Sequence, residues 1–450
     1  MSRLIIGHTT HQSVKIWARA FKRWPVAIIQ IFDKANRRYG NVQKHLTDSG
    51  EFHTHVFKVT GLNDDTSYKV KLYFAKNLES DSDEWIRTEY TEGHFTTFKS
   101  TGSAFSFVFG SCNLHSMGWF ERPDRAWLQM SKIAQHNKAS FMLHCGDQIY
   151  ADIPLKPPSN FDHFRDKYLD AWDDCIPAKK FLTELPHYMI LDDHEIINNY
   201  TQDMQLRNRD PQTLANFAMK VYWEFQHSHN PDTPDQPYQY DYTFSNGTVQ
   251  FFVMDTRYNR ISSKSDQNNQ MIDEAQKQRL FNWLESHRDQ IKFIVSSVPF
   301  VGVVLDDNND KWCSTSYKDQ RDDILSFIHH NQLKKICFLT GDMHNSYLAE
   351  LEIKDENKQT LIHELMSSPI NQITPNVELN KRYANGPSGK NHWSLKQGEK
   401  VKSKIIKSSF YGNHSNVTVV EVEDEESIRY RVYRTSENMM QPVKRGQFKL

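Results

Sequence analysis

The strongest constraint on the fold is a set of six short apolar segments, each followed at once by residues that can bind a metal ion or a phosphate group. Amphipathic stretches with helical periodicity lie among them, at residues 123–136, 212–226 and 273–287. This pattern predicts an α/β fold. Ligands bind at the carboxyl ends of the strands in such folds, so the six clusters should meet at one rim. The clusters are Gly110-Ser111-Cys112, Gly146-Asp147-Gln148-Ile149-Tyr150, Asp192-Asp193-His194-Glu195, Asp255-Thr256-Arg257, Ser296-Ser297 and Gly341-Asp342-Met343-His344.

Residues 4–98 follow a different pattern, in which apolar and polar side chains alternate along short β-branched and aromatic segments. Period-two alternation between turn residues predicts an antiparallel β-sandwich. Thr66-Ser67-Tyr68 enters a strand after a Leu and a turn, which is typical of the tyrosine corner of fibronectin-like sandwiches, although an ordinary half-buried Tyr remains the alternative. The small polar linker at residues 99–104 separates two predicted domains, residues 1–98 and 104–450.

Composition and charge exclude several classes of protein. The chain has 55 Lys and Arg against 56 Asp and Glu, so no global positive charge favours binding to nucleic acid. With 17 Gly and 16 Pro among 450 residues, it is neither collagen-like nor a disordered low-complexity chain. The longest apolar run, residues 293–305, is shorter than a membrane-spanning helix.

The cysteines and the first residues bear on the compartment. Five Cys without paired spacing are typical of free thiols in a reducing compartment. The opening residues show no basic region, apolar core and cleavage site in series. We therefore expect a cytoplasmic protein, and an exported mature form is the alternative.

Each cluster alone is compatible with an ordinary turn, but two of them indicate metal chemistry. Three carboxylates and a His stand together at residues 192–195, where they would repel one another unless solvated or bound to metal. Asp342 and His344 lie two residues apart, as in a metal clamp. Motifs of other reaction types are absent from the sequence. Cys112 has no Arg six residues later, as a cysteine-nucleophile phosphate loop requires, and neither a nucleotide-binding P-loop nor a serine-nucleophile elbow occurs.

The ordered set GSC, GDQIY, LDDHE, DTRYNR, QKQRLFNWL and TGDMH, behind a strand-rich N-terminal region, closely resembles the PhoD-like alkaline phosphatases of the metallophosphoesterase class. The resemblance covers nearly the whole chain. It implies a four-layer αββα catalytic sandwich behind an N-terminal fibronectin- or immunoglobulin-like β-sandwich. It also implies iron(III) and calcium, with Zn²⁺ or Mn²⁺ as alternatives, and hydrolysis of small phosphate mono- or diesters.

The resemblance assigns roles to particular residues. Asp147 would bridge two metal ions, with Cys112 and Tyr150 as ligands of the ferric ion. His194 would be the catalytic imidazole, kept protonated by Glu195 or Asp192, and Arg257 would contact phosphate. The remaining metal ligands implied are Asp193, whose carboxylate suits Ca²⁺, and Asp342 and His344.

Two alternatives remain at this stage. A purple-acid-phosphatase-like phosphomonoesterase would also join a fibronectin-like domain to a ferric centre. Purple acid phosphatases have Asp-x-Gly in the first motif, where this chain has Gly110-Ser111-Cys112. They have Gly-His-x-His in the last motif, where this chain has Gly341-Asp342-Met343-His344. The other alternative is a binding protein in which the catalytic rim is vestigial. Retention of every expected type of metal donor argues against it.

Overall fold

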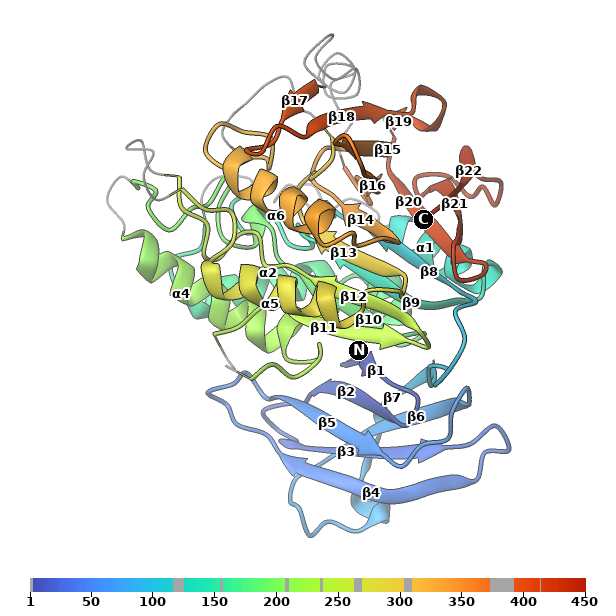
Figure 1. Cartoon of the computed structure of the whole chain (residues 1–450). Coiled ribbons are helices and arrows are strands. Elements are labelled where there is room, and N and C mark those ends of the chain that lie inside the picture. Colours follow the sequence, from blue (N-terminus) through green and yellow to red (C-terminus); the bar gives the residue numbers. More distant parts are fainter. Residues whose placement is uncertain are drawn as a thin grey trace.

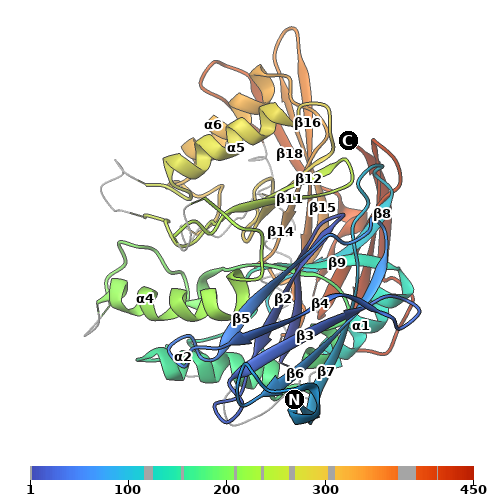
Figure 2. The same ribbon diagram turned by 90° about the horizontal axis from the view of Figure 1, so that it is seen from below.

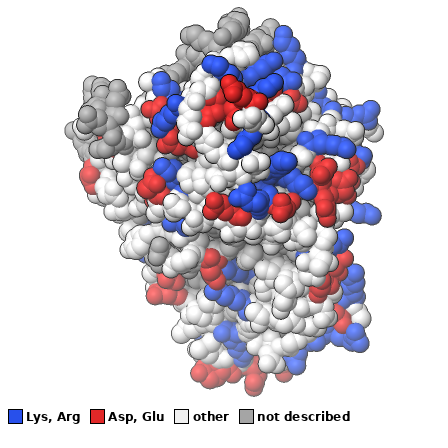
Figure 3. Space-filling model, in the orientation of Figure 1, with Lys and Arg blue, Asp and Glu red and all other residues white. Residues whose placement is uncertain are grey.

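The computed structural model describes residues 3–115, 125–153, 157–206, 210–234, 238–262, 269–302, 310–372, 392–412 and 414–450. Within them, the α/β prediction and the N-terminal all-β prediction are both confirmed. No helix in these ranges is long and apolar enough to cross a membrane. On the face shown in Figure 3, acidic and basic side chains are interspersed, in keeping with the balanced composition.

The N-terminal part, drawn in blue at the bottom of Figure 1, is a β-sandwich. Apolar side chains alternate with polar ones along its strands, and the inward set, including Ile16, Ile29 and Leu72, forms one buried core. The three-stranded sheet consists of β1 (Leu4–Thr9), β2 (Ser13–Arg19) and β5 (Thr54–Thr60). The four-stranded sheet consists of β4 (Arg38–Leu46), β3 (Val26–Phe32), β6 (Ser67–Ala75) and β7 (Ile86–Thr96), and the short helix η1 (Ser82–Glu84) precedes β7.

The tyrosine corner is present. Tyr68 is buried, and its hydroxyl oxygen accepts a hydrogen bond from the backbone N–H of Asn63 at 2.9 Å. The sandwich strands end at Thr96 and the next strand begins at Phe105. The division of the chain at residues 98 and 104 stays a prediction.

The remainder contains two mixed sheets packed face to face. In the first, β8, β9 and β10 run parallel, and β20 pairs antiparallel with β8. Its order is β10 (His187–Ile190), β9 (Ala139–Cys145), β8 (Phe105–Gly110), β20 (Asn416–Val422), β21 (Ser427–Arg434) and β22 (Lys444–Lys449).

The second sheet has a parallel centre with antiparallel edges. Its order is β11 (Tyr242–Asn246), β12 (Val249–Val253), β13 (Lys292–Ser296), β14 (Ile336–Thr340), β16 (Gln359–Ser367), β15 (Asn345–Lys354), β18 (Lys400–Ile405) and β17 (His392–Ser394), with β19 (Tyr411–Gly412) also paired to β15.

Helices cover the outer faces of both sheets. Along β13, Phe293 and Val295 belong to the core between the sheets, whereas Ile294 belongs to the core beneath α5 and α6. This alternation is that of a four-layer αββα sandwich, as the resemblance implied. The helices are α1 (Arg125–His136), α2 (Phe161–Tyr168), α3 (Ile176–Phe181), α4 (Pro211–Tyr222), α5 (Glu274–Ser286) and α6 (Lys318–His330), with π-helical turns η2 (Leu169–Asp173) and η4 (Trp223–His227) and short helices η3 (Asp193–Glu195) and η5 (Lys407–Ser409).

The three helical predictions are close to the observed helices. Asp273 caps α5 by accepting the N–H of Gln276 at 2.7 Å, and the predicted stretch at 212–226 is α4 continued by η4. Residues 123 and 124 of the first prediction lie outside the described residues.

Backbone hydrogen bonds join the β-sandwich to the αββα part. The N–H groups of Ile6 and His8 donate to Leu182 and His229, and that of His94 donates to Thr183 at 2.7 Å. A side chain at Gly7 would place its Cβ 2.4 Å from the His229 carbonyl oxygen, so this close approach needs glycine. The β-sandwich is thus fixed against the rest.

Candidate metal centre

All six predicted clusters follow or end strands that are neighbours in one of the two sheets. Contacts then join the rims of the two sheets. The backbone N–H of Asp342 donates to Ser111 Oγ at 3.1 Å, and Ser297 Oγ donates to Asp192 Oδ1 at 2.8 Å. Gly146 has a φ of +96°, and a Cβ there would lie 2.6 Å from that of Asp192. The clusters therefore meet at one site, as expected from the sequence.

Four of the predicted metal ligands adopt backbone conformations that are unusual for residues other than glycine. The φ angles are 60° at Cys112, 54° at Asp147, 72° at Asp342 and 52° at His344. Each such conformation is strained and persists only where surrounding structure imposes it, and these outliers concentrate at functional sites. Predicted ligands thus account for four of the twelve non-glycine residues that have a positive φ in the described part of the chain.

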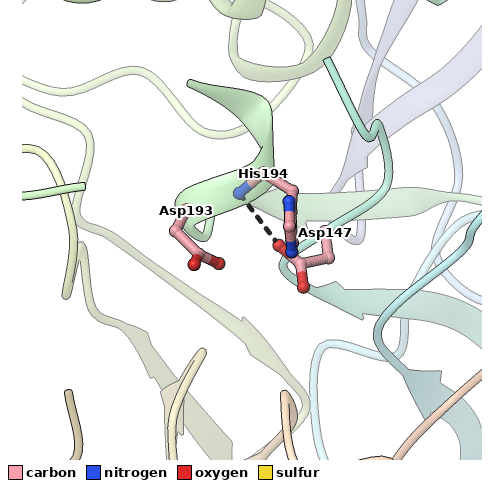
Figure 4. A group of neighbouring side chains, drawn as sticks. All are labelled: Asp147, Asp193 and His194. Carbon is pink, nitrogen blue, oxygen red and sulfur yellow. Dashed lines mark hydrogen bonds between the residues drawn. The ribbon is translucent and has the colours of Figure 1, made fainter. Parts of the chain in front are cut away.

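Asp147 lies beside His194, with Asp193 on the same loop as His194 (Figure 4). Asp147 Oδ1 accepts the backbone N–H of His194 at 3.2 Å, and Asp147 Oδ2 lies 3.4 Å from both Cys112 Sγ and the Tyr150 hydroxyl. Asp147, Asp193 and His194 each offer a ligand atom within 4.8 Å of the others. One buried carboxylate is therefore shared by donors from three motifs.

The electrostatics of the cluster call for a cation. Burial raises the pKa of Asp147 well above its usual range, and the charge of Asp193 raises it further. Burial, followed by the charges of Asp147 and Asp342, also raises the pKa of the Cys112 thiol. Burial and the charge of Cys112 raise the pKa of Tyr150. A positive ion among these groups would oppose each of these effects.

The donor set therefore fits metal. Carboxylates, a thiol, a phenol and imidazoles are all metal-binding groups, and their mutual repulsion is relieved by bound cations. Burial, with the charges of His194 and Lys311, lowers the pKa of His344 to about 4, which leaves its imidazole neutral as a metal ligand requires.

His194 has a different partner from those expected. Its Nδ1 lies 2.7 Å from Asp152 Oδ1, whereas the Glu195 carboxylate accepts backbone N–H groups of Asp147, Gln148 and Asp192. The expectation that Glu195 or Asp192 pairs with this imidazole was therefore wrong. Burial alone would lower the pKa of His194, but the carboxylates of Asp193, Asp147 and Asp152 outweigh it and raise the pKa well above 6.5.

Arg257 is completely buried and paired with carboxylates. Its Nη2 lies 2.6 Å from Asp192 Oδ1, and its Nη1 lies 2.8 Å from Asp310 Oδ1. Asp193 Oδ1 is 4.0 Å from Nη2. These contacts position the loop that carries Asp193 and His194, while direct contact of Arg257 with phosphate stays a prediction.

Asp342 and His344 face the same centre from the second sheet. Lys311 Nζ contacts Asp342 Oδ2 and lies 2.6 Å from Asp310 Oδ2. His344 Nε2 lies 3.2 Å from Gln372 Nε2. Through Asp310, Lys311 and Arg257, a continuous chain of buried and half-buried charges links the last motif to the residue before Asp193.

Sequence reasoning missed Asp152, Asp310 and Lys311. Asp152 is the second residue after GDQIY, and its spacing from Tyr150 gave no signal that it turns toward His194. Asp310 and Lys311 stand in a polar stretch, DDNNDKW, which reads as an exposed loop. Only the folded chain shows that both are enclosed.

Comparison with solved structures extends these observations. A structure of PhoD superposes with a TM-score of 0.75 at 18% identity, covering 99% of this chain and 89% of that chain. A purple acid phosphatase from yellow lupin (Lupinus luteus) seeds superposes with a TM-score of 0.59 at 12% identity, covering 99% of this chain and 74% of the lupin chain. The sandwich fold and its rim of buried donors thus define the class, a metallophosphoesterase-type fold.

Sequence comparison gives the particular family. The profile of the PhoD-like phosphatases matches residues 107–427, and the chain belongs to this family. Alkaline phosphatase D of Bacillus subtilis (strain 168) is 24% identical over 295 residues, which are 57% of this chain and 48% of that protein. The chain thus spans about half the length of this curated relative in the match. PhoD-like phosphatases are metal-dependent, and the centre around Asp147 is the candidate metal-binding site.

Proposed function

We propose that this protein hydrolyses small phosphate esters, mono- or diesters, at the centre around Asp147. The observation that carries the proposal is the convergence of Cys112, Tyr150 and the His194 loop on one fully buried carboxylate. Membership of the PhoD-like phosphatases supports it. When bound, the metal ions supply the positive charge that holds phosphate oxygens and activates water.

The protein side chains supply the remaining chemistry. The raised pKa of His194 favours its protonated form, which can donate a proton to the leaving oxygen. Asp152 holds its Nδ1, which leaves Nε2 to face the substrate. Arg257 and Asp192 hold the loop in place, and Ser297 adds a hydrogen bond to Asp192.

We further propose iron(III) and calcium as the metals. Cys112 and Tyr150 offer thiolate and phenolate, which suit a ferric ion, and Asp193 offers the oxygen donor that calcium prefers. Zinc or manganese would keep the same reaction class. A cytoplasmic location remains part of the proposal.

The first experiment is elemental analysis of the chain purified without chelator, together with Asp147→Asn and, as matched control, the exposed Asp289→Asn. We expect iron and calcium in the wild type and control, and loss of both in Asp147→Asn. Hydrolysis of a mono- and a diester should fall by more than about 100-fold. Undiminished hydrolysis by folded Asp147→Asn would refute the proposal.

Two further results separate the alternatives. Cys112→Ser should lose iron and any visible charge-transfer band, and unchanged iron content would favour a purple-acid-phosphatase-like ligand set. Zinc or manganese in the wild type would overturn the ferric assignment. Absence of metal even after reconstitution would favour the binding-protein alternative.

A further inference from the structure

A cavity lies apart from the metal centre. It measures about 530 Å³ and lies between β2 and β5 of the β-sandwich and the α4–η4 segment of the αββα part. Figure 2 views the molecule from the side of the β-sandwich, with α4 beside β5. None of the predicted metal ligands lines the cavity. Its volume falls within the range of about 300–1,000 Å³ that is typical of small-molecule sites.

The walls of this cavity, which we term the sandwich–helix pocket, are rich in aromatic rings. Tyr240 and Tyr258 meet edge to face, with ring centroids 5.1 Å apart. Tyr238 is 74% exposed, an unusual exposure for a large aromatic side chain. Aromatic faces of this kind pack against the flat, C–H-bearing faces of ring-shaped ligands. The aromatic lining residues are His55, Trp223, Tyr238, Tyr240 and Tyr258.

Polar groups that make no hydrogen bond to a described residue also line the pocket, although Lys220 Nζ lies 5.3 Å from the centroid of the Phe161 ring. The Tyr240 hydroxyl, the Trp223 indole N–H and Lys220 Nζ make no hydrogen bond to any residue that the structure describes. Asn216 adds an amide, and Glu51 adds a carboxylate acceptor. Donors and acceptors are thus mixed around the cavity. Hydroxyl groups, which both donate and accept, match such a mixture.

The charges of the lining residues balance. Lys15, Lys58 and Lys220 face the three carboxylates of Glu51, Glu224 and Asp232. Lys15 and Lys58 both contact Asp232, at 2.8 and 2.7 Å. Glu224 is paired with Arg165, whose Nε lies 2.8 Å away. The pocket therefore has no excess positive charge that would select a bare phosphate or another small anion.

We propose that the sandwich–helix pocket binds a neutral sugar, with one or two pyranose rings stacked between its aromatic walls. The rings would bury their C–H faces against Trp223 and the tyrosines, and their hydroxyls would meet the polar groups that make no hydrogen bond to a described residue. Both parts of the chain build the pocket, since His55 comes from β5 and Trp223 from η4. Sugar binding would give the β-sandwich a role beyond packing.

The test uses the full chain and does not depend on hydrolysis. Glucose, mannose, N-acetylglucosamine and maltose are titrated by calorimetry and by saturation-transfer NMR, with adenosine as a planar aromatic probe. We expect at least one sugar to bind with a dissociation constant of about 1 mM or tighter. Tyr238→Ala should weaken the binding of that sugar by about 3- to 10-fold. Tyr240→Phe, which keeps the ring and removes the hydroxyl, should also weaken it.

The matched control is Tyr90→Ala, an exposed tyrosine on β7 outside the pocket. Its sugar affinity should equal that of the wild type. Absence of binding by every sugar, binding of adenosine alone, or equal sugar affinity in Tyr238→Ala and the wild type would each overturn the proposal. Thermal melting of each variant confirms that the fold is retained, and Tyr238→Ala removes a side chain that is mostly solvated.

Discussion

At the residue scale, the metal centre depends on the balance of buried charge. Asp192 and Asp310 are buried and Asp342 is half-buried, and Lys311 and Arg257 form ion pairs with these three carboxylates. A buried ion pair contributes little net stability, but removal of one partner leaves an uncompensated charge. Lys311 is thus an internal counter-ion for Asp342 wherever metal does not supply one.

This role predicts the behaviour of Lys311→Met. In protein freed of metal by a chelator, the free energy of unfolding should fall by about 3 kcal/mol, because the half-buried Asp342 loses its cation, whereas Asp310 keeps Arg257 and Arg260. The metal-loaded variant should lose less, because an ion at Asp342 replaces part of the missing charge. Urea unfolding of both forms measures the difference.

The control for this experiment is Lys318→Met, at the exposed first residue of α6, which should change neither form by more than about 0.5 kcal/mol. Equal losses for Lys311→Met with and without metal would show that Lys311 contributes through packing and is no counter-ion.

The residues of the site were predictable to the extent that they follow strands. Asp147 and Asp342 could be found because each follows an apolar segment after a single glycine. Asp152 and Lys311 could not, because the direction of a side chain in a loop depends on tertiary contacts that leave no periodic pattern.

At the element scale, the β-sandwich shows which features local sequence determines. The tyrosine corner was predicted because the turn and the strand β6 are adjacent in the chain, and Tyr68 bonds back over only five residues. The pairing of β20 with β8 was not predicted, because the two strands lie more than 300 residues apart and strand composition does not identify a partner. Sheet order therefore had to come from the structure.

The corner makes a prediction for stability. Tyr68→Phe keeps the buried ring but leaves the N–H of Asn63 without its acceptor, so the free energy of unfolding should fall by about 1–2 kcal/mol. Tyr73→Phe on the same strand is the matched control, since its hydroxyl bonds to no described residue. Chemical denaturation measures both. A loss for Tyr73→Phe as large as that for Tyr68→Phe would contradict a specific role for the corner.

At the scale of the whole molecule, buried histidines lie where the β-sandwich meets the αββα part. His229 accepts the backbone N–H of His8 through its carbonyl, and His227 packs among Tyr222, Tyr240 and Tyr242. Both are almost fully buried, and burial, reinforced by the charge of neighbouring groups including Lys15, lowers the pKa of each to about 3. Below pH 6.5 the unfolded chain therefore binds protons at these two imidazoles, whereas the folded protein keeps the imidazoles neutral.

This difference predicts acid sensitivity of a definite sign. Above pH 6.5, His227 is neutral in both the folded and the unfolded protein. Between pH 6.5 and about 3, it is protonated only in the unfolded chain, so the free energy of unfolding decreases as the pH is lowered. At pH 5 the loss is about 2 kcal/mol for each such histidine. His227→Phe, which preserves an aromatic ring, should therefore lose about 2 kcal/mol less than the wild type between pH 7 and pH 5. Urea unfolding at both pH values measures the effect, and the exposed His136→Gln is the control. Equal losses of unfolding free energy in the wild type and in His227→Phe would exclude His227 as a source of acid sensitivity.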